Sequence, residues 1–343
     1  MRSAGGSCRA AAVSRRPQPP SERARHPSRS EGRMTRPPVT VLMTVHNGEP
    51  YLRTAIDSVL AQTYPAFRLL IIDDASRDDT QDIIRSYDDP RIECVILERN
   101  VGQTAALNLG LRRAASPWLA RMDADDYSAP ERLETQMDLV AREASLGCIG
   151  TFAWAFRQNP QVVDGVIEKP LTDDDIRRHF WRVIPLIHGS LIMRRELMLS
   201  AGGYDERYRY AADWDLYHRL LARCRAANVP KPLLGIRRHP DQNSFLKASM
   251  DETIHIFSRA LAVHGCARRE RAALRAGLSY LYVNRARCDR VEGQLGELLR
   301  DVGCALRWSP ATAGKQLFAS IVPQGARAIL TRPPKRPGLW GAQ

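Results

Sequence analysis

Between residues 39 and 143 the chain alternates four times between a short apolar run and a longer amphipathic segment. The apolar runs lie at 39–45, 68–74, 92–98 and 118–123, and the amphipathic segments at 50–64, 79–87, 104–114 and 130–143. Runs of the first kind, such as VTVLMTV, are typical of buried strands, and segments of the second kind have helical spacing. Strands and helices that alternate at such short intervals predict an α/β fold with a mostly parallel central sheet and helices on both faces.

The alternation is less regular after residue 145. Apolar runs at 148–156 and 187–193 predict two further strands, and apolar stripes between residues 250 and 305 predict packed helices. We therefore expect four segments, which are a disordered basic lead (1–36), the α/β domain (37–248), a helical appendage (249–305) and a basic tail (306–343). Met34 is an alternative start of the native chain.

The positive charge of the chain gathers at its two ends. The formal net charge is +13, with nine Arg against two Glu in residues 1–36, and fifteen Lys and Arg against seven Asp and Glu in residues 251–343. A nucleic-acid-binding protein carries its positive charge on the folded face that meets phosphate, so we expect no nucleic-acid partner. Basic ends fit an enzyme that touches an anionic membrane surface. The segment 315–340 suits an interfacial segment and a solvated tail equally well.

The cysteines and the apolar runs indicate a cytoplasmic location. Seven cysteines are scattered without a CxxC pair, which favours a reducing compartment over a disulfide framework or a zinc site. No apolar run has the length of a secretory signal or a bilayer span. We expect a cytoplasmic protein, peripheral at the inner face of the cell membrane.

Polar residues follow each of the first four predicted strands. The sequences are MTVHNGE (43–49), DDAS (73–76), RNVG (99–102) and DADD (123–126). A single acid in such a position is often only a helix N-cap or a turn residue. Since ligands of parallel sheets bind outside the carboxyl ends of the strands, the joint occurrence predicts one shared site.

Several chemistries that place acids after strands fit less well. A phosphorelay receiver domain has its acidic pair after the first strand, and a haloacid-dehalogenase phosphatase has its Asp-x-Asp near that strand. A dinucleotide oxidoreductase needs GxGxxG in the first turn, where this chain has HNGEPY. A sugar nucleotidyltransferase would carry a Gly-rich loop with Lys or Arg at the same place.

A string of motifs over residues 38–246 resembles family 2 glycosyltransferases of the GT-A fold. The matching segments are VLMTVHNGEPYLRTAIDSVLAQTY, LLIIDDASRDDT, ERNVGQTAALNLGL, ARMDADD, GSLIMRRELMLSAGGYDE, AADWDLYHRL and RRHPDQNS. The resemblance implies a GT-A nucleotide-diphospho-sugar transferase fold. It also implies an inverting glycosyltransferase that binds a nucleotide-sugar donor and a glycan or lipid-linked acceptor.

The resemblance assigns the acids after the fourth strand to a divalent metal, Mg²⁺ or Mn²⁺. Asp125 is the expected ligand, Asp123 contacts the ribose or a metal-bound water, and His239 reaches the metal. Arg237 is expected to close over the diphosphate. A bound dication would turn the mutual repulsion of neighbouring carboxylates into attraction, and oxygen ligands are those that such cations prefer.

The resemblance also assigns a nucleotide site. Thr44 and His46 would flank the base, Asp74 would accept a hydrogen bond from the uracil N3–H, and Asn100 would shape the loop beside the base. This set favours UDP or dTDP as the nucleotide. Leu107 stands where the family often has Arg, so one nucleotide contact of the family is missing here.

The segment AADWDLYHRL (211–220) corresponds to the family's acceptor side, and Asp213 matches its catalytic base. A base facing the anomeric carbon from the side opposite the diphosphate implies inversion. Ala212 replaces the Glu that the family usually has before this Asp. We expect a metal-dependent transferase of cell-surface polysaccharide biosynthesis. The alternative is a catalytically inactive, nucleotide-sugar-binding scaffold of the same fold.

Overall fold

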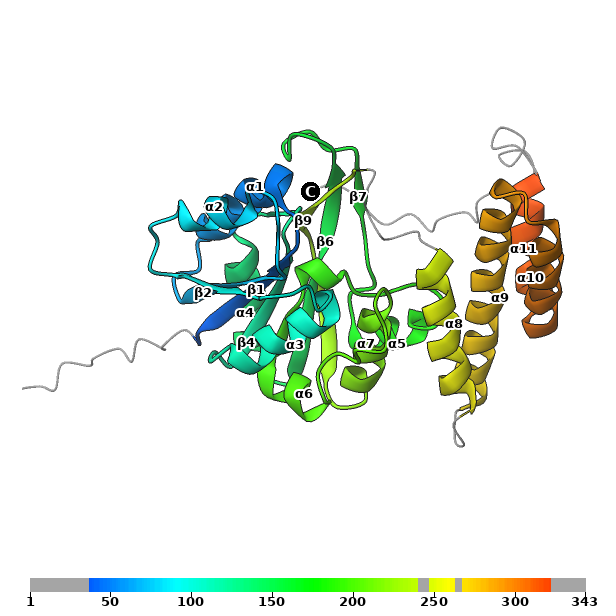
Figure 1. Ribbon diagram of the computed structural model, residues 1–343. Coiled ribbons are helices and arrows are strands. Elements are labelled where there is room, and N and C mark those ends of the chain that lie inside the picture. Colours follow the sequence, from blue (N-terminus) through cyan, green and yellow to red (C-terminus); the bar gives the residue numbers. More distant parts are fainter. Residues whose placement is uncertain (1–36, 240–246, 263–266, 322–343) are drawn as a thin grey trace, which may run out of the picture. The chain divides into compact units, whose positions relative to one another are not determined.

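The computed structural model describes residues 37–239, 247–262 and 267–321 (Figure 1). The described residues, from Pro37 onward, form one compact unit. The predicted basic lead, and the predicted tail from residue 322 on, lie outside the described residues.

The first half of the domain follows the predicted alternation. Its elements are β1 (Val39–Val45), α1 (Glu49–Leu60), β2 (Phe67–Asp73), α2 (Thr80–Arg85), β3 (Ile92–Ile96), α3 (Gln103–Arg113), β4 (Trp118–Asp123) and α4 (Arg132–Arg142). Strands β3, β2, β1 and β4 are neighbours in that order and run parallel. The predicted α/β class is confirmed, and the predicted strand ends are correct to within two residues.

The second half is more irregular. Its elements are β5 (Tyr127–Ser128), β6 (Leu146–Phe156), β7 (Gly165–Ile167), α5 (Asp173–His179), the 3₁₀ turn η1 (His188–Ser190), β8 (Ile192–Arg194), α6 (Arg195–Ser200), α7 (Ala212–Leu221) and β9 (Arg225–Arg237). The prediction of one strand over 187–193 is wrong in its first part, because residues 188–190 form the 3₁₀ turn and β8 begins only at Ile192.

One central sheet contains all nine of these strands. The order is β3-β2-β1-β4-β8-β6-β9-β5, with β7 added beside β6. Strand β8 is antiparallel to β4 and to β6, whereas β9 is parallel to β6. The pairing of β9 shifts register between Val229 and Leu234, where Pro230 and Pro232 remove two backbone donors from the ladder.

Alternating residues of β1 divide the core into two layers. Val41 and Met43 pack with Leu52 and Ile56 of α1 on one face of the sheet. Leu42 belongs to the other core cluster, which includes residues of α3, α6 and α7. Helices therefore cover both faces of the sheet (Figure 1). The carboxyl ends of the parallel strands β1 to β4 lie at one edge of it.

The described residues after 246 form four helices, three of them in the region where the sequence predicts helices and the last in the segment predicted as a basic tail. They are α8 (Lys247–Ala262), α9 (Arg268–Val291), α10 (Leu295–Trp308) and α11 (Pro310–Ile321). Phe257 of α8 packs edge-on against Trp181 and Trp214, with ring centroids 5.0 Å apart in each pair. At Gly277 of α9 a Cβ would lie 2.1 Å from the Trp181 carbonyl oxygen, so only glycine allows this close approach. Helices α8 and α9 thus continue the core of the domain, whereas α10 and α11 pack with α9 around a small separate cluster. Figure 1 shows the four helices side by side.

Within the described residues, no helix combines the length and the apolar character that crossing a bilayer requires.

Candidate active site

The strand register aligns the polar strand ends that the sequence singles out. Thr44 of β1 pairs with Ile72 of β2 and with Asp123 of β4, and Val45 pairs with Asp73. The loops after these strands therefore meet at one edge and open into a cavity of about 840 Å³.

Eight of the nine predicted site residues line this cavity. They are Thr44, His46, Asp74, Asn100, Asp123, Asp125, Asp213 and His239. The expected metal ligand Asp125 and the expected base Asp213 thus share one space, although 88 positions separate them in the sequence.

Arg237 is the ninth predicted residue, and the structure turns it away from the cavity. Its guanidinium donates to the backbone carbonyl of Asp125 at 2.9 Å and to those of Arg157 and Gln158 at 3.0 and 3.1 Å. The side chain lies against the rings of Tyr51 and Phe156 and is 5% exposed. In this arrangement Arg237 supports the turn that carries Asp125, and its expected role at a diphosphate stays a prediction.

Three carboxylates crowd the turn after β4. Burial, and then the neighbouring Asp123, raise the pKa of Asp125, while the hydrogen bond from His239 opposes that rise. Burial, Asp125 and Asp123 together raise the pKa of Asp126 well above its ordinary range. The raised pKa values reflect repulsion between neighbouring carboxylates in a buried site with little water.

One buried cation, Arg121 of β4, offsets part of this repulsion. It is 3% exposed, and its Nη1 pairs with the Asp123 carboxylate. Its Nε has no hydrogen-bond partner among the described residues. The sequence analysis did not assign Arg121, although a charged residue inside the apolar run WLARMD is a signal that could have identified it.

The donor set beside Asp125 fits a divalent cation that is shared with a ligand. His239 Nε2 lies 2.9 Å from Asp125 Oδ2, and its ring rests on Tyr51 at 4.9 Å. Within the described residues, no three His, Cys, Asp or Glu side chains are arranged to hold a metal by themselves. Mg²⁺ sites commonly use one or two carboxylates and complete the coordination with substrate phosphates and water, so this smaller donor set is sufficient.

Asp74 is buried and organises the loop beside the predicted nucleotide site. Its Oδ1 accepts from the backbone N–H of Val101 at 2.7 Å, and its Oδ2 accepts from that of Gly102 at 2.8 Å. His46 Nδ1 lies 2.8 Å from the backbone carbonyl of Asp74. Each carboxylate oxygen keeps one lone pair, so a contact with a base edge would be additional to these two bonds.

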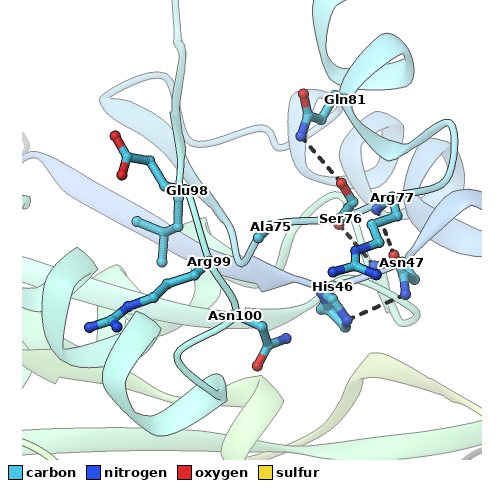
Figure 2. Close-up of a pocket in the computed structure, with 10 residues that line it drawn as sticks. His46, Asn47, Ala75, Ser76, Arg77, Gln81, Glu98, Arg99 and Asn100 are labelled. Atoms are coloured by element: carbon cyan, nitrogen blue, oxygen red, sulfur yellow. Dashed lines mark hydrogen bonds between the residues drawn. The ribbon is translucent and has the colours of Figure 1, made fainter.

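A second cavity of about 500 Å³ adjoins the first and shares His46, Asn47 and Asn100 with it. Figure 2 shows the side chains of His46 and Asn47 beside Ser76 and Arg77. Asn47 accepts from the Arg77 backbone N–H at 2.9 Å and donates its own N–H to Ser76 Oγ at 2.9 Å. Asn47 has φ +54° and Ala75 has φ +58°. Two non-glycine residues in the left-handed region store strain here, as ligand sites often do.

Thr44 contributes the one hydroxyl of β1 that faces the main cavity. The residue is 8% exposed, and its Oγ1 has no hydrogen-bond partner among the described residues. A buried hydroxyl without a partner is unfavourable, so a bound ligand that supplies one would be stabilised there.

Asp213 lies in the first turn of α7 and is half-buried. Burial raises its pKa to about 6, opposed by the Trp214 backbone N–H, which donates to Oδ1 at 2.8 Å. A carboxylate with a pKa near neutrality is suited to accept a proton in a reaction at physiological pH.

Other groups around Asp213 were not assigned from the sequence. His188 lines the cavity, with Nδ1 2.7 Å from the Tyr217 hydroxyl and Nε2 3.1 Å from that of Tyr204. Burial and the charge of Arg121 lower its pKa well below the ordinary value, because both disfavour the charged imidazolium. Lys169 lines the same cavity from the irregular segment after β7, where no sequence pattern marks it.

Comparisons with known proteins find a family and relatives for the part of the chain that carries this site. The family model described as glycosyl transferase family 2 matches residues 40–199. The amylovoran biosynthesis glycosyltransferase AmsE of Erwinia amylovora is 27% identical over 207 residues, which is 59% of this chain and 77% of AmsE.

Two solved structures share the fold. TarS of S. aureus, in complex with UDP-GlcNAc, has a TM-score of 0.60 and 17% identity over 81% of this chain and 83% of its own. A mannosyltransferase of Pyrobaculum calidifontis, in complex with GDP-Man and Mn²⁺, has a TM-score of 0.58 and 18% identity over 86% and 81%. At these identities the likeness concerns the fold alone.

Proposed function

We propose the following reaction for this chain, which belongs to glycosyl transferase family 2 through residues 40–199. The enzyme transfers a sugar from a nucleotide-diphospho-sugar, of which the nucleotide is UDP, to a glycan or lipid-linked glycan. The transfer inverts the configuration at the anomeric carbon and depends on a divalent metal. The process is polysaccharide biosynthesis, as the name of the relative AmsE states for that protein.

One observation carries the proposal. Asp125 and Asp213 line the same cavity of about 840 Å³, one just after strand β4 and the other in the first turn of α7. A reaction that holds a charged leaving group at one end and removes a proton at the other needs two such carboxylates in one space.

Asp125 and His239 are the residues that would hold the metal, with Asp123 beside them. When bound, Mg²⁺ or Mn²⁺ neutralises charge on the diphosphate oxygens as the leaving group departs. The mannosyltransferase of the same fold was solved with Mn²⁺, which supports a dication of this kind.

The nucleotide is proposed to occupy the smaller cavity at His46, Asn47 and Asn100. Asp74, which lines the adjoining main cavity, holds the Val101–Gly102 backbone and keeps an acceptor position for a base N–H. UDP is favoured because uracil carries an N3–H where cytosine has none, and TarS was solved with UDP-GlcNAc. Leu107 lines the main cavity without offering a polar contact.

Asp213 is proposed as the general base. As the acceptor hydroxyl oxygen bonds to the anomeric carbon, Asp213 takes the proton. The bond from that carbon to the diphosphate oxygen breaks, and its electron pair leaves with the nucleoside diphosphate. Attack from the side of Asp213, opposite the diphosphate, inverts the configuration. A positioned base contributes roughly 10²- to 10⁴-fold to the rate.

We propose that the enzyme acts at the cytoplasmic face of the membrane. The excess of Lys and Arg over Asp and Glu in residues 251–343 supports attraction to anionic lipid. Flotation with anionic and neutral liposomes tests this, and equal recovery of the protein from both would contradict it.

A thermal-shift panel of nucleotides and nucleotide-sugars, with and without Mn²⁺, tests the central proposal. Only ligands that bind the native state raise its melting temperature. We expect UDP and UDP-sugars to raise it in the presence of Mn²⁺, and release of UDP from the stabilising sugar nucleotide to follow. A panel without any metal-dependent shift would refute the proposal.

A further inference from the structure

Two cations without acidic partners among the described residues line the cavity that contains Asp213. Lys169 and Arg209 both line the main cavity, from the segment after β7 and from the loop before α7. Among the described residues, no carboxylate lies within ion-pair distance of either side chain. We propose that the acceptor carries an anionic group, phosphate or carboxylate, and that Lys169 and Arg209 bind it beside Asp213. This rests on the proposed transfer reaction and names its acceptor class.

Lys169 is the stronger of the two observations. It is half-buried, and its Nζ donates to the backbone carbonyl of Ile184 at 2.7 Å, which uses one of three protons. Burial lowers its pKa, and the charge of Asp213 opposes that shift. A lysine held in a partly dry cavity without a carboxylate partner is unfavourable by itself, and a bound anion removes that penalty.

Arg209 is exposed and lines the same cavity. Its guanidinium carbon stands 5.3 Å from the centre of the Tyr210 ring, which restrains the side chain without using its donors. A guanidinium presents a planar set of N–H groups that matches phosphate and carboxylate geometry. Lys169 and Arg209 therefore offer charge and directional donors to one group.

The position of these cations assigns them to the acceptor. The acids that would receive the donor diphosphate through a metal are Asp123 and Asp125 at the end of β4. Lys169 and Arg209 come from other elements: Lys169 lies close enough to Asp213 for that charge to act on it, and Arg209 lies four residues before Asp213 in the chain. Lipid-linked glycans carry a pyrophosphate and acidic glycans carry carboxylates, so both sources present the required chemistry.

Binding of three octyl probes to the protein loaded with UDP and Mn²⁺ tests the inference by calorimetry. The probes are neutral octyl glucoside, octyl glucuronide with a carboxylate, and octyl glucosyl pyrophosphate. We expect one anionic probe to bind at least about tenfold tighter than the neutral one, since charge-assisted hydrogen bonds are roughly twice as strong as neutral ones. The probe that binds tightest identifies the source of the anion.

Lys169→Met and Arg209→Gln should each reduce that preference about tenfold or more, whereas the exposed Lys231→Met and Arg207→Gln serve as matched controls and should retain it. Equal affinity of the wild-type protein for all three probes, or an unchanged preference in both variants, overturns the inference. UDP binding in the same titrations reports on the proposed function separately, because it does not depend on the acceptor probe.

A different observation concerns Glu252 of α8. Its Oε1 accepts from the backbone N–H of Arg209 at 2.9 Å, and its Oε2 accepts from those of Tyr210 and Ala211 at 2.7 and 2.8 Å. Ala211 is the N-cap of α7 and has no side chain that could cap the helix. One carboxylate thus binds the backbone that leads directly into the turn carrying Asp213.

We infer that Glu252 is a positioning residue for the base. An anionic group at a helix N-terminus pairs with backbone donors that have no partner within the helix. Phe257, on the same helix, packs against Trp214, the neighbour of Asp213. Helix α8 therefore holds the first turn of α7 at two points, and residues beyond 246 become part of the catalytic arrangement.

Glu252→Gln keeps the shape of the side chain but only one acceptor oxygen, and Glu252→Ala keeps none. We expect kcat to fall about tenfold or more in Glu252→Ala and less in Glu252→Gln, with UDP affinity unchanged within about twofold. The acidic limb of the pH–rate profile should also move, because the surroundings of Asp213 change. Glu297→Gln, at an exposed pair with Arg300, is the control. A lower melting temperature with unchanged kcat and pH–rate profile would contradict the positioning role.

Discussion

The two walls of the cavity are built in different ways. The donor wall consists of loops that follow consecutive parallel strands, and its acids Asp74, Asp123 and Asp125 lie within three residues of a strand end. The acceptor wall takes Lys169 from an irregular segment and Asp213 from the start of α7. Glu252 of α8 then holds the backbone before that helix.

The residues proposed to bind the nucleotide and the residue proposed to catalyse transfer are therefore held in place by different kinds of contact. On the donor wall, hydrogen bonds between neighbouring loops fix the groups, as the bonds of Asp74 to Val101 and Gly102 show. On the acceptor wall, the backbone is held by contacts between residues about 40 positions apart, such as the hydrogen bonds of Tyr210 and Ala211 to Glu252. Changes on the donor wall should therefore affect nucleotide binding, and changes on the acceptor wall should affect turnover.

The largest effect is expected for Asp125→Ala, on the donor wall. Loss of the central carboxylate should abolish metal-dependent UDP binding, since a bound metal contributes several kcal/mol, roughly a thousandfold in affinity. Calorimetry with UDP and Mn²⁺ measures this. Asp82→Ala removes an exposed acid that pairs with Arg85, and it is the control. Retention of metal-dependent affinity in Asp125→Ala would remove the acid from the proposed metal site.

Asp213→Asn tests the acceptor wall. It should leave UDP affinity unchanged and reduce kcat by about 10²- to 10⁴-fold, because the amide cannot accept the proton. A product assay beside calorimetry measures both quantities. Transfer at the wild-type rate would reject Asp213 as the base, and loss of UDP binding would show that the two walls are not separable.

The pH dependence of transfer refines the same assignment. Burial raises the pKa of Asp213 to about 6, and the reaction needs the ionised form. The rate should fall about tenfold for each pH unit below about 6. UDP affinity measured over the same range separates this limb from protonation of Asp125. A rate that stays level down to pH 4.5 would contradict the assignment.

Stability gives a smaller effect with a defined sign. Since the folded-state pKa of Asp213 lies above its unfolded value, wild-type stability falls as the pH rises from about 4 to about 6. Asp213→Asn avoids that loss, so above pH 6 its free energy of unfolding should exceed that of wild type by at most about 3 kcal/mol. Denaturant titrations at pH 4 and pH 7.5 measure the difference, which should be found only at the higher pH.

The sequence predicted the donor wall well. The four strand ends, and the convergence of Thr44, Asp74, Asp123 and Asp125 on one edge, follow from the regular geometry of parallel strands. That geometry places successive carboxyl ends together whatever the rest of the chain does. His46 and Asn100 follow from the same rule, and the structure places all six along the cavity.

The sequence predicted less where long-range packing decides. The motif that contains Arg237 was recognised, but the direction of its side chain depends on β9, whose two prolines obscure the strand pattern. The predicted strand at 187–193 failed because a 3₁₀ turn brings His188 beside Tyr204 and Tyr217. No spacing rule links Lys169 or Glu252 to Asp213.

The sequence by itself determined the sheet, the acids at its edge and the identity of the proposed base, since strand and helix periodicity and local motifs are properties of neighbouring residues. Only the tertiary structure decided that Asp213 has a raised pKa, that Lys169 and Arg209 stand beside it, and that Glu252 holds its helix. Burial and contact between distant segments create these properties, and neither exists until the chain has folded.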